Sequence, residues 1–499
     1  MKQLHITGFV FIFMLTLTAY AQEGPSLPAG LEDKDDGPSL PSGLGSDEGP
    51  SLPSGMGSDP APSLPGGLKD DSAPSLPAGL GSGEDKSAPA ESAHPVWYSV
   101  TGFLESRGCL RTQSDPYEKD ASAGEIRFQW EFETRHNEMT FRIRPDFLYD
   151  PVMDDHDIDL EEGRGFIDLR EASVSLSPLD FADVKIGRQI LTWGTGDMLF
   201  INDMFPKDWQ SFFIGRDDEY LKAPSDAVKV SLFSDIVNFD LVYTPKFDAD
   251  RSPCGKRLSY YNQSLGRRAG DDAVVRTDKP DRWFRDDELA ARIYRNFHGI
   301  EFAAYAYMGY WKGPAGMNPD TGKALFPELN VYGASVRGQI ASGIANLELG
   351  CYDSHEDKDG TDMFIDNSQF RILLGYERDL PEITRDFKAG MQYYVEHIKD
   401  YEQYEENLPP GAKPADENRH VITFRLTKQM MNQNLMLSLF TYYSPTDADV
   451  YLRPNVQYKI DDNWTAIAGG NTFTGKDDHT FFAQFEKNSN VYAGLRYGF

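Results

Sequence analysis

The most constraining feature of this chain is a period of two in its side chains, which persists to the last residue. Residues 490–499 alternate apolar side chains with smaller or polar ones and end on Phe499. The same alternation recurs from Trp97 onward, for example over 126–133, 141–147 and 387–396. This period indicates strands that have one apolar and one charged face. The apolar faces must then be covered, either by a second sheet or by lipid.

The N-terminus favours lipid. Lys2 precedes an apolar run over 4–17, and Ala19-Tyr20-Ala21 is typical of a signal-peptide cleavage site. We therefore expect a signal peptide over residues 1–21. The final strand resembles the insertion signal of bacterial outer-membrane barrels, which implies that Tyr497 and Phe499 are read by the barrel assembly machinery. In a membrane only a closed barrel satisfies the backbone of every strand, so we expect contact with outer-membrane lipid and lipopolysaccharide.

Residues 22–95 form a segment of different composition. The unit P-S-L-P-x-G-[LM] occurs five times there, separated by acidic spacers. A short unit rich in Pro and Gly cannot bury a core, so we predict a disordered tether in the periplasm. The alternative is a multivalent docking array for a periplasmic partner, because repeated weak sites bind strongly together.

Turn signals divide residues 96–499 into strands. Short polar turns are expected near 136–138, 178–180, 234–235, 296–298, 340–342, 379–381, 431–433 and 461–463. Eight such turns with one strand at each end predict an all-β, transmembrane antiparallel β-barrel of about 18 strands. Sixteen strands are the alternative, because 480–487 fits either a loop or a strand. Longer loops alternate with these turns and are assigned to the outside.

One of the long loops, 194–224, is rich in aromatic and acidic residues. Around it the chain carries Gly187-Arg188-Gln189, then Trp193-Gly194 and Asp197, and later Lys222-Ala223-Pro224. In these residues the chain resembles a family of porin-like outer-membrane barrels of unassigned function with a G-R-Q and W-G-x-x-D signature. It departs from that family after Asp197, where Met198-Leu199-Phe200-Ile201 replaces the usual N-P pair.

So many aromatic side chains would be badly exposed outside the barrel, so we expect this loop to fold into the lumen and narrow it. A loop that merely caps or plugs the barrel is the other interpretation. Candidates for the constriction are Arg188, Trp193, Asp197, Asn202, Asp203, Asp208, Trp209 and Arg216. The direction of Arg188 is left open, because the residues around it do not separate cleanly into two faces. On the lumen wall the charged faces of the first strands offer Arg107, Arg111, Arg127, Glu131, Arg142 and Arg144.

Other classes of function find little support. The formal net charge of −30 argues against nucleic acid as a partner, because phosphate binding needs clustered Lys and Arg. The three cysteines are widely spaced and suggest neither a disulfide framework nor a haem attachment site. No nucleophile, metal or phosphate-loop motif is visible, so we expect no enzyme activity, no cofactor and no bound metal. The oligomeric state is not predicted.

Three functions remain. The first is a porin-like outer-membrane channel for passive or weakly selective passage of hydrophilic solutes, since a barrel of this size is wide enough for water unless it is filled. The second is a structural or interaction barrel whose tether holds a periplasmic partner. The third is an export conduit for a polymer. The sequence names no solute.

Overall fold

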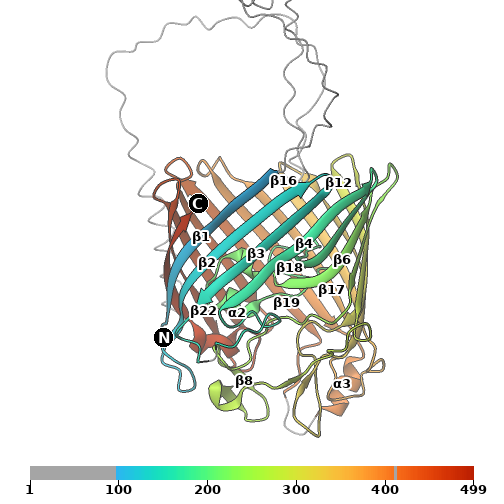
Figure 1. Cartoon of the computed structure of the whole chain (residues 1–499). Helices are drawn as coiled ribbons and strands as arrows, with labels where there is room; N and C mark the ends of the chain where they lie inside the picture. Colours follow the sequence, from blue (N-terminus) through green and yellow to red (C-terminus); the bar gives the residue numbers. More distant parts are fainter. Residues whose placement is uncertain (1–96, 155, 409–412) are drawn as a thin grey trace, which may run out of the picture. The chain divides into compact units, whose positions relative to one another are not determined.

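A computed structural model describes residues 97–154, 156–408 and 413–499. The expected signal peptide and repeat tether lie outside these residues. Within them the chain forms one closed antiparallel sheet of 18 strands, in which each strand pairs with its neighbours in sequence (Figure 1). The last strand pairs with the first from Phe103↔Gly498 to Arg111↔Asn490, and this pairing closes the barrel. The prediction of about 18 strands is confirmed, and the alternative of 16 is wrong.

The barrel strands are β1 (Trp97–Arg111), β2 (Ala121–His136), β3 (Met139–Tyr149), β4 (Ile167–Leu179), β5 (Ala182–Ile190), β6 (Pro224–Leu232), β7 (Asn238–Thr244), β11 (Glu288–Phe297), β12 (Ile300–Tyr310), β15 (Glu328–Ile340), β16 (Gly343–Ser354), β17 (Gln369–Asp379), β18 (Phe387–Ile398), β19 (Asn418–Met430), β20 (Leu435–Ser444), β21 (Asp449–Lys459), β22 (Trp464–Gly475) and β23 (Asn490–Gly498).

Short turns connect the strands at one end of the barrel, and long loops connect them at the other. Every turn expected from the sequence joins two consecutive barrel strands. Segment 480–487, ambiguous in sequence, lies in a loop and contributes to the 3-10 helix η4 (Ala483–Asn488). The long loops carry the remaining elements: α2 (Trp209–Phe213), η2 (Asp218–Leu221), β8 (Tyr260–Asn262), β9 (Arg267–Ala269), η3 (Asp271–Ala273), β10 (Thr277–Asp278), β13 (Gly316–Met317), β14 (Ala324–Leu325) and α3 (Tyr401–Asn407). None of the helices in the described part of the chain is long and apolar enough to cross a membrane.

Side chains alternate between the outside and the lumen, as the period of two requires. In β1, Leu104 and Leu110 are exposed on the outside, whereas Glu105 and Arg107 are buried on the lumen side. The C-terminal residue belongs to the outer face. Phe499 pairs through its backbone with Gly102 at 3.0 and 3.1 Å and stacks on Phe128, with ring centroids 6.0 Å apart. Its role as an assembly signal stays a prediction.

Candidate functional site

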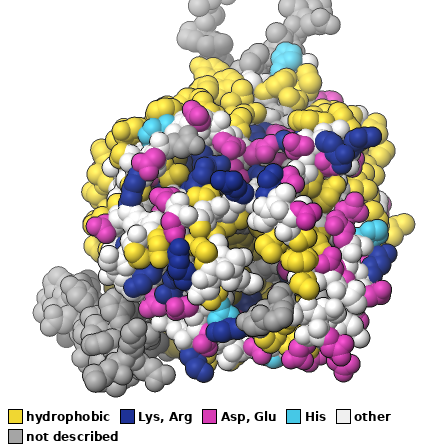
Figure 2. Space-filling view, turned by 90° about the horizontal axis from the view of Figure 1, so that it is seen from below, with side chains coloured by type: hydrophobic (Ala, Val, Ile, Leu, Met, Phe, Trp, Pro, Cys, Tyr) yellow, Lys and Arg dark blue, Asp and Glu magenta, His cyan; other side chains and the backbone are white. Residues whose placement is uncertain are grey.

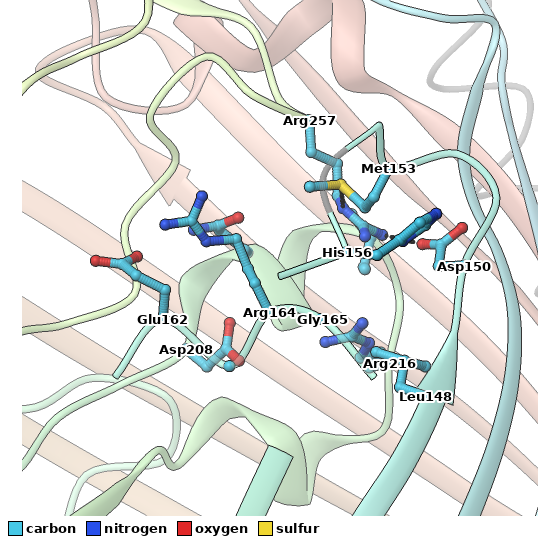
Figure 3. A pocket seen from close by; sticks show the side chains of 13 residues that line it. Leu148, Asp150, Met153, His156, Glu162, Arg164, Gly165, Asp208, Arg216 and Arg257 are labelled. Carbon is cyan, nitrogen blue, oxygen red and sulfur yellow. Dashed lines mark hydrogen bonds and ion pairs between the residues drawn. The ribbon is translucent and has the colours of Figure 1, made fainter. Parts of the chain in front are cut away.

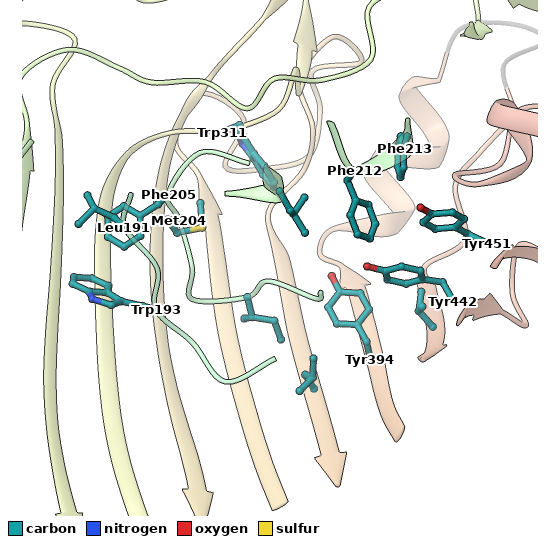
Figure 4. Packing of buried hydrophobic residues seen from close by; sticks show 14 of the residues in the cluster. Leu191, Trp193, Met204, Phe205, Phe212, Phe213, Trp311, Tyr394, Tyr442 and Tyr451 are labelled. Carbon is teal, nitrogen blue, oxygen red and sulfur yellow. The ribbon is translucent and has the colours of Figure 1, made fainter. Parts of the chain in front are cut away.

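The loop between β5 and β6, residues 191–223 (loop L3), runs through the lumen and is the candidate functional site. Asp208 caps α2 by accepting a hydrogen bond from the Ser211 N–H at 2.7 Å. The short helix presents Phe212 and Phe213 to Tyr451 on the wall, with ring centroids 5.8 and 5.6 Å apart (Figure 4). Burial of these rings explains why such an aromatic segment folds inward.

One side of L3 is fastened to β15 and β16. The carboxylate of Glu348, fully buried on β16, accepts the backbone N–H groups of Thr195 and Asn202 at 2.8 Å each. Gly333 and Gly350 face each other across β15 and β16. A Cβ atom at Gly350 would lie 2.4 Å from Ile201 Cγ2, and one at Gly333 would lie 1.7 Å from Asn202 Oδ1. Both glycines therefore leave the space that L3 occupies.

The next contacts lie on β18–β20. Gln392 accepts the Asp197 N–H at 2.8 Å and donates to the Asp197 carbonyl at 2.7 Å. Arg425 pairs with the Asp197 carboxylate, including Nη2 to Oδ1 at 2.9 Å. Partial desolvation in the lumen raises the pKa of Asp197, and Arg425 offsets only part of that effect. The Tyr442 hydroxyl donates to the carbonyl of Met198 at 2.7 Å, and Met198 itself has a left-handed backbone with φ of 60°.

Two consecutive acids of L3 meet arginines from further strands. Asp217 pairs with Arg107 of β1 at 2.9 Å and with Arg496 of β23 at 2.5 Å. Burial alone would raise the pKa of Asp217, but the two guanidinium groups outweigh it and the pKa is lowered. Asp218 lies between Arg453 of β21, with which it pairs, and Arg425, whose Nη1 is 3.5 Å away. The L3 acids thus face a row of wall arginines.

Towards β2 and β4 the loop makes close contacts with the wall. Arg216 of L3 pairs with Glu125 at 2.5 Å. The ring of Tyr220 lies between the guanidinium groups of Arg127 and Arg170, with centroid distances of 4.3 and 4.9 Å. Such an aromatic ring between two cations is a favourable, tightly packed arrangement.

Two further long loops support L3 from behind. Arg257 reaches Asp150 at 2.8 Å, and Arg251 bridges Asp168 at 3.0 Å and Asp208 at 3.3 Å. Between this network and L3 lies a pocket of about 30 Å³, which is shown in Figure 3. That volume holds about one water molecule. This part of the barrel is therefore a support for L3.

Two larger cavities lie on the opposite side of the lumen. The inner cavity, towards the short turns, has about 450 Å³ and is lined by Asp197, Asp218 and wall residues of β15–β19. The outer cavity, towards the long loops, has about 390 Å³ and is lined by L3, four other loops and β16–β20. Met198 borders both cavities. Figure 2 looks onto the long-loop end, where basic, acidic and apolar side chains surround a hollow.

The charged constriction candidates from the sequence lie in different places. Asp197 lines the inner cavity, with its side chain 45% exposed. Asp203, which pairs with Lys207 at 3.1 Å, and Asp208 are both buried within L3. Arg188 does not join the L3 acids: its guanidinium binds Asp226 at 3.0 Å and the carbonyls of Leu160 and Leu169.

The other candidates have structural contacts. Trp193 packs edge-on against Phe205 at 5.0 Å, and the Trp209 Nε1–H donates to Asp250 at 3.1 Å. Asn202 and Arg216 fasten L3 to Glu348 and Glu125, as described above. On the wall, Arg142 contacts Glu131 and Glu133 from β2, with Glu131 at 3.5 Å, and Arg144 lies 3.7 Å from Glu171.

Sequence reasoning missed the wall residues that hold L3 on its open side, Glu348, Gln392, Arg425, Tyr442 and Arg453. They are between 146 and 244 residues away from their partners in L3. One signal was available in the sequence: Asn346, Glu348 and Tyr352 share the inward face of β16, and all three bind L3 backbone atoms.

Comparison with known proteins supports the architecture. No protein-family model matches the chain, and no curated protein matches it either. Among solved structures it is similar to OccAB4 of Acinetobacter baumannii, with 9% identity, a TM-score of 0.50, and coverage of 82% of this chain and 99% of that one. Other matches are OccK11 (OpdR) of Pseudomonas aeruginosa (10% identity, 80% and 95% coverage, TM-score 0.47) and Salmonella typhi OmpF in complex with daunomycin (10%, 81% and 97%, 0.39). At 9% identity the likeness to OccAB4 concerns the fold alone. The chain therefore has a porin-like fold, and its own strand pairing makes it a closed 18-stranded β-barrel.

Proposed function

We propose that the protein is an outer-membrane channel that passes small hydrophilic solutes along one side of its lumen, past L3. The observation that carries this proposal is the pair of cavities on the two sides of L3, which share Met198 as a lining residue. A solute that moves between them must pass the Asp197–Arg425 pair. Passage by diffusion needs no catalytic group, so the proposal does not include an enzyme activity.

The charges at this point favour a weakly selective channel. Asp197 and Asp218 are 45% and 43% exposed, and both pair with Arg425 on the opposing wall. Opposed charges across a narrow passage orient dipolar solutes and set ion preference. The acids belong to the loop and the arginines to the wall. Neutralising the acids therefore leaves the positive charge of the arginines to act on a passing ion.

The test uses purified full-length protein in planar bilayers. The wild type is expected to conduct, and Asp197→Asn combined with Asp218→Asn is expected to lower the permeability of cations relative to anions. A unit charge about 4 Å from the path is worth ~1 kcal/mol in water, so we expect a change of about fivefold per charge at low salt and less at high salt.

The matched control is Asp180→Asn with Asp235→Asn, two exposed acids in the short turns. It removes the same charge outside the lumen and should leave selectivity unchanged. A wild-type barrel that is heat-modifiable on gels but electrically silent would contradict the channel and favour the structural barrel. An equal effect of the control pair would show that surface charge, and not L3, sets selectivity.

A further inference from the structure

We infer that the outer cavity is a binding site for a small organic cation that carries an aromatic or apolar body and a hydrogen-bond acceptor. The inference rests on the proposed channel function and adds the class of solute that the channel would concentrate before it reaches L3. It stands on the walls of the cavity, on the pairing of its charges and on two polar groups that have no partner among the described residues.

The walls are mainly aromatic. Rings from L3, from two other loops and from the barrel wall surround the same 390 Å³: Phe200, Trp209, Trp311, Tyr352, Tyr394, Tyr442, Phe481 and Phe482. A volume of this size suits a small ligand with one ring. Aromatic faces attract both apolar groups and cations, because their quadrupole is negative on the face.

The basic residues at the cavity are already paired. Each of the four contacts a carboxylate: Lys207 with Asp203 at 3.1 Å, Lys312 with Glu288, Arg371 with Glu396 at 3.2 Å, and Arg419 with Asp447 at 2.8 Å. An anionic ligand would have to displace one of these carboxylates. Paired cations therefore do not make this cavity an anion site.

One acid is the exception. The Asp366 carboxylate lines the cavity and has no hydrogen bond or ion pair among the residues that the structure describes. Its backbone is held in place, because its N–H donates to Ala315 at 2.8 Å and the neighbouring Phe364 carbonyl accepts from Met317 at 2.9 Å. The carboxylate is thus fixed at the cavity with its charge available.

Two charged groups on the wall act on Asp366. Asp366 is exposed to the cavity, but the desolvation that the surrounding protein causes, together with Glu396 of β18, raises the pKa of Asp366 to about 7, and Arg371 of β17 acts in the opposite direction. A cation bound beside Asp366 would be an additional positive charge and would stabilise its ionised form. Cation binding and ionisation of Asp366 should therefore support each other.

The second unpartnered group is a donor. Trp311, 7% exposed, lines the cavity, and its indole Nε1–H has no hydrogen-bond partner among the described residues. A buried donor without a partner is costly, and a ligand acceptor would satisfy it. A hydroxyl or carbonyl oxygen on the ligand would accept from Trp311, and an ammonium group would lie near the carboxylate of Asp366.

Three probes that share a phenol separate the charge from the ring. They are tyramine, which is a cation, its neutral alcohol analogue tyrosol, and the anion 3-(4-hydroxyphenyl)propionate. Titration calorimetry on the detergent-solubilised full-length protein is expected to give affinities in that order. A charge-assisted contact favours tyramine over tyrosol by about tenfold.

Two variants locate the site. Asp366→Asn should weaken tyramine binding by about tenfold and leave tyrosol unchanged, and Trp311→Phe should weaken all three probes because it removes the shared donor. Asp359→Asn is the matched control, since Asp359 is an exposed acid of the same loop that does not line the cavity. Tyramine affinity should also fall in the wild type from pH 8 to pH 6, as Asp366 becomes protonated while the ammonium group stays charged, and should be constant in Asp366→Asn.

The outcomes are distinguishable from those of the channel test. Equal binding of tyramine and tyrosol, or tighter binding of the anion, would overturn the cation site. A barrel that conducts but binds none of the probes would overturn this inference and leave the channel intact. Tyramine binding that depends on Asp366 in a barrel that does not conduct would support the site and contradict the channel.

Discussion

The two sides of the lumen use the same residue types for different purposes. On the side of β2–β4, Arg127 is only 2% exposed and Arg170 only 1%. Carboxylates and the ring of Tyr220 enclose them. On the side of β15–β19, the Arg337 side chain is 47% exposed and lines a cavity of about 450 Å³. An arginine on the lumen face of a strand is thus a structural element where L3 covers it and a channel-lining element where L3 does not.

The largest expected effect concerns stability on the covered side. Arg127→Leu leaves Asp146 buried without an ion pair among the described residues. Glu125 loses the same arginine, 3.3 Å away in the wild type, but keeps Arg216. Breaking a buried ion pair costs about 3–5 kcal/mol, so the free energy of unfolding should fall by that amount. Urea unfolding in lipid or detergent, followed by the gel shift on heating, measures it.

Arg337→Leu is the matched control on the open side. Its only ion pair among the described residues, with Glu377, spans 4.0 Å, and exposed pairs contribute about 0–1 kcal/mol. This variant should leave unfolding nearly unchanged and alter conductance instead. Similar losses of stability in both variants would show that the two sides do not differ as proposed.

Sequence patterns predicted the barrel well for a physical reason. Alternation with period two and turn residues are local signals, and the strands and short turns of the barrel follow them closely. The inward direction of L3 also follows from local composition, since rings such as Phe212 and Phe213 need burial. The position of each L3 acid does not follow, because a loop has no period and the partners are distant: Asp197 meets Arg425, while Asp203 meets Lys207 within the loop.

Arg188 shows the same limit within a strand. Its spacing from Ile186 would place both residues on one face of β5, but Gly187, with φ of 114°, interrupts the regular backbone between them. Ile186 is exposed, whereas Arg188 is buried. Its guanidinium donates to the Leu160 carbonyl in the loop after β3, and no pattern in the sequence of β5 predicts this contact. The sequence predicted Arg127 on the lumen wall, but its burial under L3 depends on Tyr220, which is 93 residues away along the chain.

A second prediction tests whether L3 is seated on the open side by the two facing glycines. Gly350→Val places methyl groups where Ile201 Cγ2 lies 2.4 Å from the added Cβ, without backbone strain, because Gly350 has no positive φ. The loop should lift from β15 and β16, and single-channel conductance should rise. Clashes of this kind cost about 1–3 kcal/mol, so the barrel should remain folded.

Gly390→Val serves as its control. A Cβ atom there meets Glu377 Cβ at 3.3 Å and no part of L3. Because Gly390 lines the inner cavity, the added methyl groups should leave conductance unchanged or lower it slightly. A decrease in conductance in both variants would indicate that L3 does not move and that the two glycines only keep the passage wide.

The smallest expected effect concerns the point where the two cavities meet. Tyr442→Phe removes one hydrogen bond, from the hydroxyl to the Met198 carbonyl, and keeps the ring. Met198 has a left-handed backbone, which is costly for a residue with a side chain, so this segment is held against its own preference. A net contribution of about 0.5–1.5 kcal/mol per hydrogen bond predicts a change of about two- to tenfold in the ratio of open to closed times.

Tyr376→Phe deletes the same group from a bond to Ala341 in a short turn, 2.8 Å long and without contact to L3, and should not alter gating. Single-channel recordings measure the ratio of open to closed times. The same ratio in both variants would show that the mobile element is not at Met198. A change confined to Tyr442→Phe would locate the gate on the open side of the lumen, where the ion pairs between the loop and the wall involve the partly exposed Asp197 and Asp218.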